Sequence, residues 1–568
     1  MKKRIYGLLA PLCLLAGMTA CEDALDTTSE GYVFDKDHSL SAANDSLYSA
    51  MGILSRLQTL GEKYVTYGEL RGDLVSVPAT APLAYQRINA FETLDADDAA
   101  GMKRDFYSVI NNCNIALARM DTTVTEHGSQ VLMPEYAAIR TMRDWTLLQL
   151  GLAYGEASFA DGPILDVEAA ESNYGSIALD ELVRKLIADL EPLAARNTPN
   201  YGNIDGFSSK LFFIKPALLL GDLYLYNGNY REAAAMYYKV IKDEGYVVSV
   251  DNANHWTTSV RNESIDGHSQ TYTSEAVSII PYASDAKKYH PDMVNLTYNR
   301  APAFTPATWF VNEMSASQHY HIDRLGITNI SGYLEGDLRG AMTDRDGVTT
   351  PSAYGDIKTG TDGSECLITK FMFNGTLYSS VTNPNNPLME NGAILCRSIA
   401  LYRIPHIYLR YAEAVNRAGK PSLAFAVLKY GLRSEVLDDE TKVAPEELAD
   451  QEAWTNFSDP TFDRNYGTAM RGRGLGIAVE QTDYVLPETD DKDELIEWVE
   501  DRILDEMASE TGFEGNRFFD LLRISHHRAA HPQYMVKKIA RRFDNPAAIE
   551  SKLSDISALW IKSRIMEK

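Results

Sequence analysis

The spacing of apolar and polar residues predicts helices over much of the chain. It favours helices at residues 46–60 and 102–120. A further helix is expected at 495–508, where the acidic residues of 490–494 stand directly before the apolar pattern. Carboxylates in that position stabilise a helix N-terminus through the helix dipole. The pattern therefore predicts a mainly α-helical protein.

Small and aromatic residues mark two pairs of antiparallel helices at the offsets of tetratricopeptide repeats. In residues 216–241 these are Leu220, Gly221, Tyr224, Gly228, Tyr230, Ala233 and Tyr237. In residues 408–432 they are Ala412, Gly419, Ala424 and Leu428. A weaker pair combines 140–154 with 180–195. About 160 residues separate the two best units, so the chain is not a simple solenoid, whose repeats stack in sequence order.

The stretch between these two units, residues 246–399, has a different pattern. It is rich in aromatic residues, proline and glycine, and two runs, 366–373 and 393–404, alternate like short strands. Cys366 and Cys396 lie in these runs. They could meet across a hairpin or remain buried free thiols, and we favour the second interpretation. The five cysteines form no C-x-x-C pair, so neither a disulfide framework nor a metal site of that kind is expected.

Charged residues recur at helical spacing in residues 503–523. Three carboxylates are expected on one helical face: Glu506, Glu510 and Glu514. Like charges at this spacing repel by a few tenths of a kcal/mol unless cations neutralise them. The nearest cations in the sequence are Arg502 and Arg517, and a further pair at an interval of three is Asp520 and Arg523. We interpret this stretch as a charged face held by ion pairs, without catalytic chemistry.

Composition is that of an ordinary globular protein, with 45% hydrophobic and 23% charged residues among 568. The net charge is −25, and it becomes −28 without residues 1–20, which carry three basic and no acidic residues. A body this acidic repels nucleic-acid phosphates and anionic lipids. We therefore expect no nucleic-acid partner and a neutral or cationic ligand.

The N-terminus has the features of a secretory signal. Three basic residues precede an apolar run at 8–17 that is too short to span a bilayer. The run ends in Met-Thr-Ala followed by Cys21, which resembles a bacterial lipobox. We expect lipidation of Cys21, where each buried acyl CH₂ contributes about 0.8 kcal/mol to anchoring. The alternative is ordinary signal-peptidase cleavage that leaves Cys21 free.

The charged stretch near the C-terminus resembles the signature of the SusD/RagB family of outer-membrane nutrient-binding lipoproteins. The positions in register are Glu506, Glu510, Phe513, Glu514, Gly515, Arg517, Asp520, Leu521 and Arg523. Met507 and Thr511 depart from the signature, which has Arg and Leu there. The resemblance covers most of residues 21–525. The chain ends in a basic, helix-like tail at 537–568, whereas the family commonly ends in a short Asn-rich strand and turn.

This resemblance implies a mainly α fold of tetratricopeptide-like helical pairs, interrupted by a large irregular insertion with a few short strands. The expected order is a lipoprotein signal peptide at 1–20, a tether at 21–45 and a single SusD-like fold at 46–568. Its helical part would occupy about 46–245 and 401–530, and its ligand-binding insertion about 246–399. Glu22 and Asp23 resemble the surface-export signal of such lipoproteins; a solvated acidic tether is the alternative.

The implied function is a non-enzymatic surface protein. It would capture oligosaccharides and pass them to a SusC-like TonB-dependent outer-membrane transporter, with the lipid anchor holding it to the membrane. A peptide ligand within the same family is the alternative, and a glycoside hydrolase on a helical scaffold is the less favoured one. No cofactor is expected.

Aromatic residues of the insertion are the expected sugar-binding platform, because indole and phenol faces stack on pyranose rings. The rings in this stretch are Trp256, Tyr272, Tyr282, Tyr289, Tyr298, Trp309, Tyr320, Tyr333 and Tyr354. We select Trp256 and Trp309. The segment 64–82 is rich in glycine and proline and long for a connection without regular structure, which favours a functional role. The ligand-binding candidates are therefore Tyr67, Arg71, Asp73, Trp256 and Trp309.

No catalytic or metal-binding residue is expected. Ser284 and Lys287 match the S-x-x-K box of penicillin-recognising enzymes, but the S-x-N box that must follow is missing. His527 and His531 have helical spacing without the glutamate of H-E-x-x-H, so a zinc site is not expected. Neither a P-loop nor a dinucleotide fingerprint occurs.

Overall fold

The computed structural model of the protein describes most of the chain from residue 43 to residue 564. The residues outside the description are 1–42, 173, 249–274, 286, 299–300, 322–332, 338, 344–348, 352, 359–363, 372–395, 449–452, 473–484 and 565–568. The predicted signal peptide, Cys21 and Trp256 therefore lie outside the described residues.

The described part is mainly helical. The helices of the first half are α2 (Ala43–Leu57), α3 (Gly61–Leu70), α4 (Leu83–Asn89), α5 (Arg104–Arg119), α6 (Met133–Tyr154), α7 (Val167–Glu171), α8 (Leu179–Leu190), α9 (Pro216–Asn227), α10 (Tyr230–Glu244) and α12 (Met293–Thr297). Those of the second half are α14 (Ile404–Arg417), α15 (Pro421–Lys429), α16 (Ser434–Leu437), α17 (Pro445–Leu448), α18 (Thr468–Gly472), α19 (Lys492–Thr511), α20 (Arg517–His527), α21 (Tyr534–Ala540) and α22 (Pro546–Leu553).

The strands are short and form two-stranded antiparallel ladders. They are β1 (Val75–Ser76), β2 (Thr125–Glu126), β3 (Ser129–Gln130), β4 (Glu156–Ala157), β5 (Ile177–Ala178), β6 (Asn203–Ile204), β7 (Phe207–Ser208), β8 (Ala276–Pro281), β9 (Thr305–Pro306), β10 (His319–His321), β11 (Tyr333–Glu335), β12 (Ala341–Thr343), β13 (Thr349–Pro351), β14 (Tyr354–Lys358), β15 (Ser364–Ile368) and β16 (Ser398–Arg403). The mainly α fold class expected from the sequence is confirmed.

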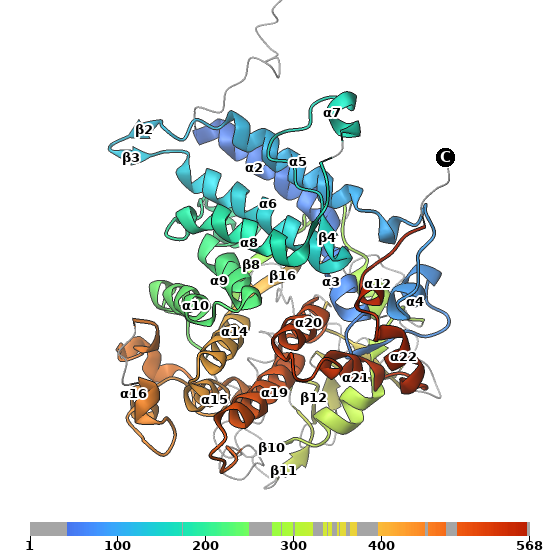
Figure 1. Ribbon diagram of the computed structural model, residues 1–568, viewed down its shortest axis with the longest axis vertical. Coiled ribbons are helices and arrows are strands. Elements are labelled where there is room, and N and C mark those ends of the chain that lie inside the picture. Colours follow the sequence, from blue (N-terminus) through green and yellow to red (C-terminus); the bar gives the residue numbers. More distant parts are fainter. Residues whose placement is uncertain are drawn as a thin grey trace, which may run out of the picture.

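The long helices form one continuous stack. Helices α2, α5, α6, α8, α9 and α10 pack in chain order, α14 packs on α10, and α15 and α19 complete the stack (Figure 1). The inner helices, such as α14, are buried on nearly all sides, whereas the outer ones bury an apolar stripe. In α8 the stripe has helical spacing and consists of Leu179, Leu182, Val183, Leu186, Ile187 and Leu190. The main hydrophobic core therefore runs along the whole stack.

The two predicted repeat units are confirmed as helical pairs, α9 with α10 and α14 with α15. In the first pair Gly221 lies against the ring of Tyr237, and a Cβ atom on Gly221 would come within 2.8 Å of that ring. Gly228 ends α9 with a φ of +83°, a left-handed conformation that suits glycine. The weaker earlier pair is also present, as α6 and α8. The two best units are direct neighbours because α10 packs on α14.

The ends of the insertion meet each other. Strand β8 pairs with β16, with Ile280 opposite Ile399, and β16 leads directly into α14. A second connection joins the early segment to the insertion through β1 and β9, where Val75 lies opposite Pro306. The described cysteines Cys113, Cys366 and Cys396 are free thiols, as favoured from the sequence. Cys366 lies in β15, which pairs with β14, so the less favoured alternative, a hairpin between the two cysteine-bearing runs, is not formed among the described residues.

The C-terminal tail forms the predicted helices and packs on residues of the first half of the chain, where Arg542 donates to the carbonyl of Leu70 and Lys552 to that of Ala90. Helices α21 and α22 lie beside α3 and α4 (Figure 1). After them the chain pairs with the early segment through a bridge between Leu94 and Ser563, and Ile561 donates its backbone N–H to Ala153. No described helix combines the length and apolar composition needed to cross a membrane.

Candidate functional site

The acidic residues of the C-terminal stretch lie at the junction of the helical stack and the insertion. Asp491 caps α19 by accepting hydrogen bonds from the backbone N–H groups of Asp493 and Glu494, as the acidic run predicts. Helix α19 ends at Thr511 and a tight turn follows, with φ values of +69° at Phe513 and +95° at Gly515. Glu514 therefore reaches out from the turn. The prediction that it shares a helical face with Glu506 and Glu510 is wrong, because the helix ends before it.

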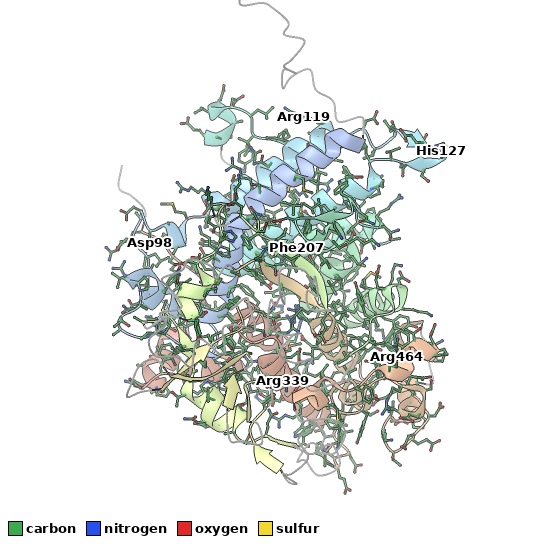
Figure 2. The ribbon with its side chains drawn as sticks, turned by 180° about the vertical axis from the view of Figure 1, so that it is seen from behind. Asp98, Arg119, His127, Phe207, Arg339 and Arg464 are labelled. Atoms are coloured by element: carbon green, nitrogen blue, oxygen red, sulfur yellow. The ribbon has the colours of Figure 1, made fainter. Side chains whose placement is uncertain are left out.

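The cations that neutralise these carboxylates come from distant parts of the chain. Arg339, in the insertion, lies 2.5 Å from Glu506 Oε1 and 3.3 Å from Glu510 Oε2. Its side chain is 1% exposed, and Asp337 binds the other edge of the guanidinium at 2.7 Å. Figure 2 shows Arg339 where the insertion meets the C-terminal helices.

Two more cations complete the cluster. Arg403, at the end of β16, lies 2.7 Å from Glu514, 3.1 Å from Glu510 and 3.3 Å from Glu275. Lys370 lies 2.5 Å from Glu514 and donates to the carbonyl oxygens of Glu510 and Gly512. We call Glu506, Glu510 and Glu514 with Arg339, Lys370 and Arg403 the buried charge cluster.

Electrostatics in the buried charge cluster follow from burial and pairing. Burial raises the pKa of Glu514, but Arg403 and Lys370 outweigh it and hold the pKa below its ordinary value. Burial dominates at Glu506 and raises its pKa despite Arg339. The pairs fix two segments of the insertion and the end of β16 onto α19. The physical role is therefore structural.

The local cations predicted from sequence spacing have other partners. Arg502 pairs with Asp505 at 2.8 Å, and Arg517 pairs with Asp73 at 2.5 Å. The prediction that they neutralise Glu506 and Glu514 is therefore wrong. The pair of Asp520 and Arg523, 2.9 Å apart, is confirmed.

Asp73 is the centre of a second buried cluster. Its carboxylate accepts hydrogen bonds from Arg517 and Arg541, each at 2.5 Å, and its backbone carbonyl accepts one from Trp309 Nε1. The guanidinium of Arg541 lies over the Trp309 ring. Burial raises the pKa of Asp73, but the two guanidinium groups outweigh it and hold the pKa well below its ordinary value. The cluster ties the early segment, the insertion and the C-terminal tail together.

Tyr67 and Arg71 are buried beside this cluster. Both lie at α3 or directly after it, so the predicted irregular segment is helical up to Leu70. Tyr67 donates a hydrogen bond to the carbonyl of Ala100. Arg71 donates to the carbonyl oxygens of Ala153 and Leu559, at 3.2 Å and 3.1 Å, and stacks on the ring of Phe518. Burial lowers the pKa of Arg71 to about 9, because no carboxylate in the described part of the chain offsets it.

Solved structures resemble this arrangement over nearly the whole chain. A putative sugar-binding protein from Bacteroides vulgatus matches with a TM-score of 0.54 and 16% identity, covering 86% of this chain and 88% of that one. A SusD superfamily protein from the same species matches with a TM-score of 0.59 and 15% identity, covering 91% and 95%. NanU of B. fragilis matches with a TM-score of 0.52 and 14% identity, covering 93% and 97%. The fold is SusD-like. No protein-family model and no curated protein matches the chain.

Within this SusD-like fold, four of the five candidate ligand residues lie inside the protein. Tyr67, Arg71, Asp73 and Trp309 are each at most 7% exposed and contact other parts of the chain. Trp256 lies outside the described residues. Ligand contact by these residues stays a prediction, while the geometry gives the four buried ones a structural task. Among the described residues, no group of three or more His, Cys, Asp or Glu could hold a metal ion.

Tyr289 is an exposed aromatic residue that our selection missed. Its side chain is 49% exposed, and it is the one exposed ring among the insertion side chains that the structure describes. Burial raises the pKa of its phenol to about 12, and the negative charges of Glu62, Asp105 and Asp292 add to this rise. The sequence around the two residues indicated that Tyr289 is exposed and Trp309 buried, because Tyr289 stands in a polar run and Trp309 in an apolar one.

Glu69 should make the stability of the SusD-like fold depend on pH. It is fully buried on α3, and one oxygen accepts the backbone N–H of Gly515 at 2.7 Å. Burial raises its pKa to about 7. A raised pKa means that the contribution to stability is present below pH 4.5 and is lost as pH rises through 7.

The wild type should therefore lose about 3 kcal/mol of its free energy of unfolding, relative to Glu69→Gln, as the pH rises from 4 to 8. Urea unfolding at several pH values measures the difference. Glu440→Gln, at an exposed position, is the control and should follow the wild-type profile. A constant difference between Glu69→Gln and wild type would contradict the assignment.

Proposed function

We propose that the protein binds glycans at the cell surface and passes oligosaccharides to a SusC-like TonB-dependent outer-membrane transporter. The observation that carries the proposal is the SusD-like fold, shared over most of the chain with a protein described as sugar-binding. The acidic body supports it, because a neutral oligosaccharide meets no repulsion there.

The proposal includes an envelope location. The lipobox-like sequence at Cys21 supplies a lipid anchor in the outer membrane, and Glu22 and Asp23 direct the protein to the exterior. The protein acts as a binding protein without catalysis. Because the ligand has to be released to the transporter, we expect its affinity to be modest and its binding reversible.

Tyr289 gives the proposed ligand surface an exposed ring in the described part of the insertion. Sugar rings stack on such a face, and nearby carboxylates accept hydrogen bonds from hydroxyl groups. The carboxylate of Asp292, three residues further along the chain, is exposed, whereas Glu62 already accepts hydrogen bonds from Tyr85 and from the backbone N–H of Asp292, at 2.9 and 3.0 Å. Trp256 stays a proposed ligand contact. Tyr67, Arg71, Asp73 and Trp309 are proposed to hold the surrounding segments in place.

A binding panel tests the function. Purified protein is titrated calorimetrically with neutral oligosaccharides and with peptides, and each oligosaccharide mixture is analysed for cleavage products. Binding of glycans without cleavage supports the proposal. Binding of peptides alone would favour the peptide-binding alternative, and product release would favour a glycoside hydrolase.

Tyr289→Ala should weaken binding of the glycan found in this panel about tenfold, since a lost stacking contact corresponds to about 1.4 kcal/mol. The thermal unfolding midpoint should stay within about 1 °C, because the ring is half exposed. Tyr174→Ala is the matched control: its side chain is 41% exposed beside α7, and affinity should not change. Equal affinity of Tyr289→Ala and wild type would remove Tyr289 from the ligand surface.

A further inference from the structure

A cavity of about 40 Å³ lies in the core where six elements meet. Residues of α3, α6, α9, β16, α14 and α20 line it, together with Asn516 in the turn before α20. It is far too small for a sugar. About 10–15 Å³ accommodates one water molecule, so the cavity has room for two or three.

The charged groups of the cavity wall already bind one another. Asp222 accepts hydrogen bonds from Tyr237, Tyr402 and Arg410, at 2.5, 2.5 and 3.0 Å. Arg523 binds Glu413 through two hydrogen bonds of 2.8 and 2.6 Å. No charged group of the described wall is therefore left to bind an ion by itself.

Four lining side chains carry a buried polar atom without a hydrogen-bond partner among the described residues. These atoms are Gln149 Oε1, His406 Nε2, Arg410 Nε and Asn516 Nδ2. All four side chains are at least nine-tenths buried. Leaving such a group without a partner is costly, so native structures satisfy nearly all of them.

The roles of the four atoms can be assigned. Asn516 Oδ1 accepts a hydrogen bond from Tyr64 at 2.9 Å, so Nδ2 is a free donor, like Arg410 Nε. Burial and the nearby guanidinium groups of Arg410, Arg403 and Arg523 lower the pKa of His406 well below its usual range, so its ring is neutral. Its other nitrogen donates to the carbonyl of Leu401, which leaves Nε2 as an acceptor.

The wall thus offers two donors and two acceptors. A metal cation would face the two N–H donors, and an anion would face the lone pairs of Gln149 and His406. Water carries two donors and two acceptors and satisfies both kinds of group. We propose that this cavity is a binding site for internal water, which joins α6, α14 and the turn before α20 through Gln149, His406, Arg410 and Asn516.

Crystals of the purified protein test the proposal. Ordered water is expected within about 2.7–3.2 Å of at least one of the two acceptors and one of the two donors. An empty cavity would overturn it. Parallel crystals soaked in bromide and in rubidium distinguish ions, and an anomalous peak in the cavity from either would also overturn it.

A variant adds a second readout. Gln149→Leu removes one acceptor, so the water bound to it should be lost and the thermal midpoint should fall by on the order of 2 °C. Gln130→Leu, on the exposed strand β3, is the control and should change neither. If the cavity were dry, Gln149→Leu would remove an unsatisfied group and raise the midpoint, which would overturn the proposal.

Discussion

Replacing Arg403 with Met should lower the free energy of unfolding by about 3–5 kcal/mol, the cost of removing one partner from a buried ionic network. Arg403 is 3% exposed and binds Glu275, Glu510 and Glu514. Without it, Glu514 keeps Lys370 and Glu510 keeps Arg339 at 3.3 Å. Arg339 and Lys370 are then the cations left in the buried charge cluster, and two positive charges cannot neutralise its three glutamates, which are shielded from water.

The shift of the urea midpoint measures this effect. Lys239→Met is the control, because Lys239 pairs with Asp243 at 2.5 Å on the surface of α10. An exposed pair of this type contributes little, and its loss should change stability by at most about 0.5 kcal/mol. Similar midpoints for the two variants would show that the buried charge cluster does not hold the insertion to α19.

A single methyl group at Gly68 should have an effect of comparable size. Helix α3 crosses the turn after α19 so closely that a Cβ atom on Gly68 would lie 1.8 Å from the backbone oxygen of Gly515. That oxygen belongs to the turn with positive φ, and Glu69 holds the turn in place by accepting the backbone N–H of Gly515 at 2.7 Å. We expect Gly68→Ala to cost about 3 kcal/mol, the upper end of overpacking effects.

Gly52→Ala is the matched control for this variant. Gly52 also lies inside a helix, but apart from its chain neighbours and the helix's own backbone no described atom stands within 4 Å of the position that its Cβ would take. Alanine has the higher helix propensity, so this variant should gain about 0.5–1 kcal/mol. Thermal unfolding of both variants gives the comparison, and a stabilised Gly68→Ala would contradict the close crossing.

Contacts inside one repeat could be predicted from the sequence, whereas contacts between distant segments could not. Gly221 and Tyr237 belong to one helical pair, so their spacing alone indicates that they meet. Arg339 and Glu506 are 167 positions apart, and no local pattern connects them. The sequence therefore indicated that the three glutamates need cations as partners. Proximity along the chain suggested Arg502 and Arg517, which have other partners in the fold.

The ligand residues were hard to select for a similar reason. The presence of an aromatic residue in the sequence does not tell whether its ring is buried in a core or exposed on a surface, because this depends on the residues that pack around it in the fold. Trp309 has its indole N–H bound to Asp73 and its ring covered by Arg541. Tyr289, in contrast, keeps half of its surface open to solvent.

The direct packing of α10 on α14 has a consequence for biosynthesis. About 160 residues separate the two helices, so a chain that emerges N-terminus first, from the ribosome or from the export machinery, presents α10 well before α14. During that interval the first six helices of the stack exist without the one that covers their last face. Their apolar surface is then open to aggregation or to a chaperone, so completion of the fold has to wait for the second half of the polypeptide.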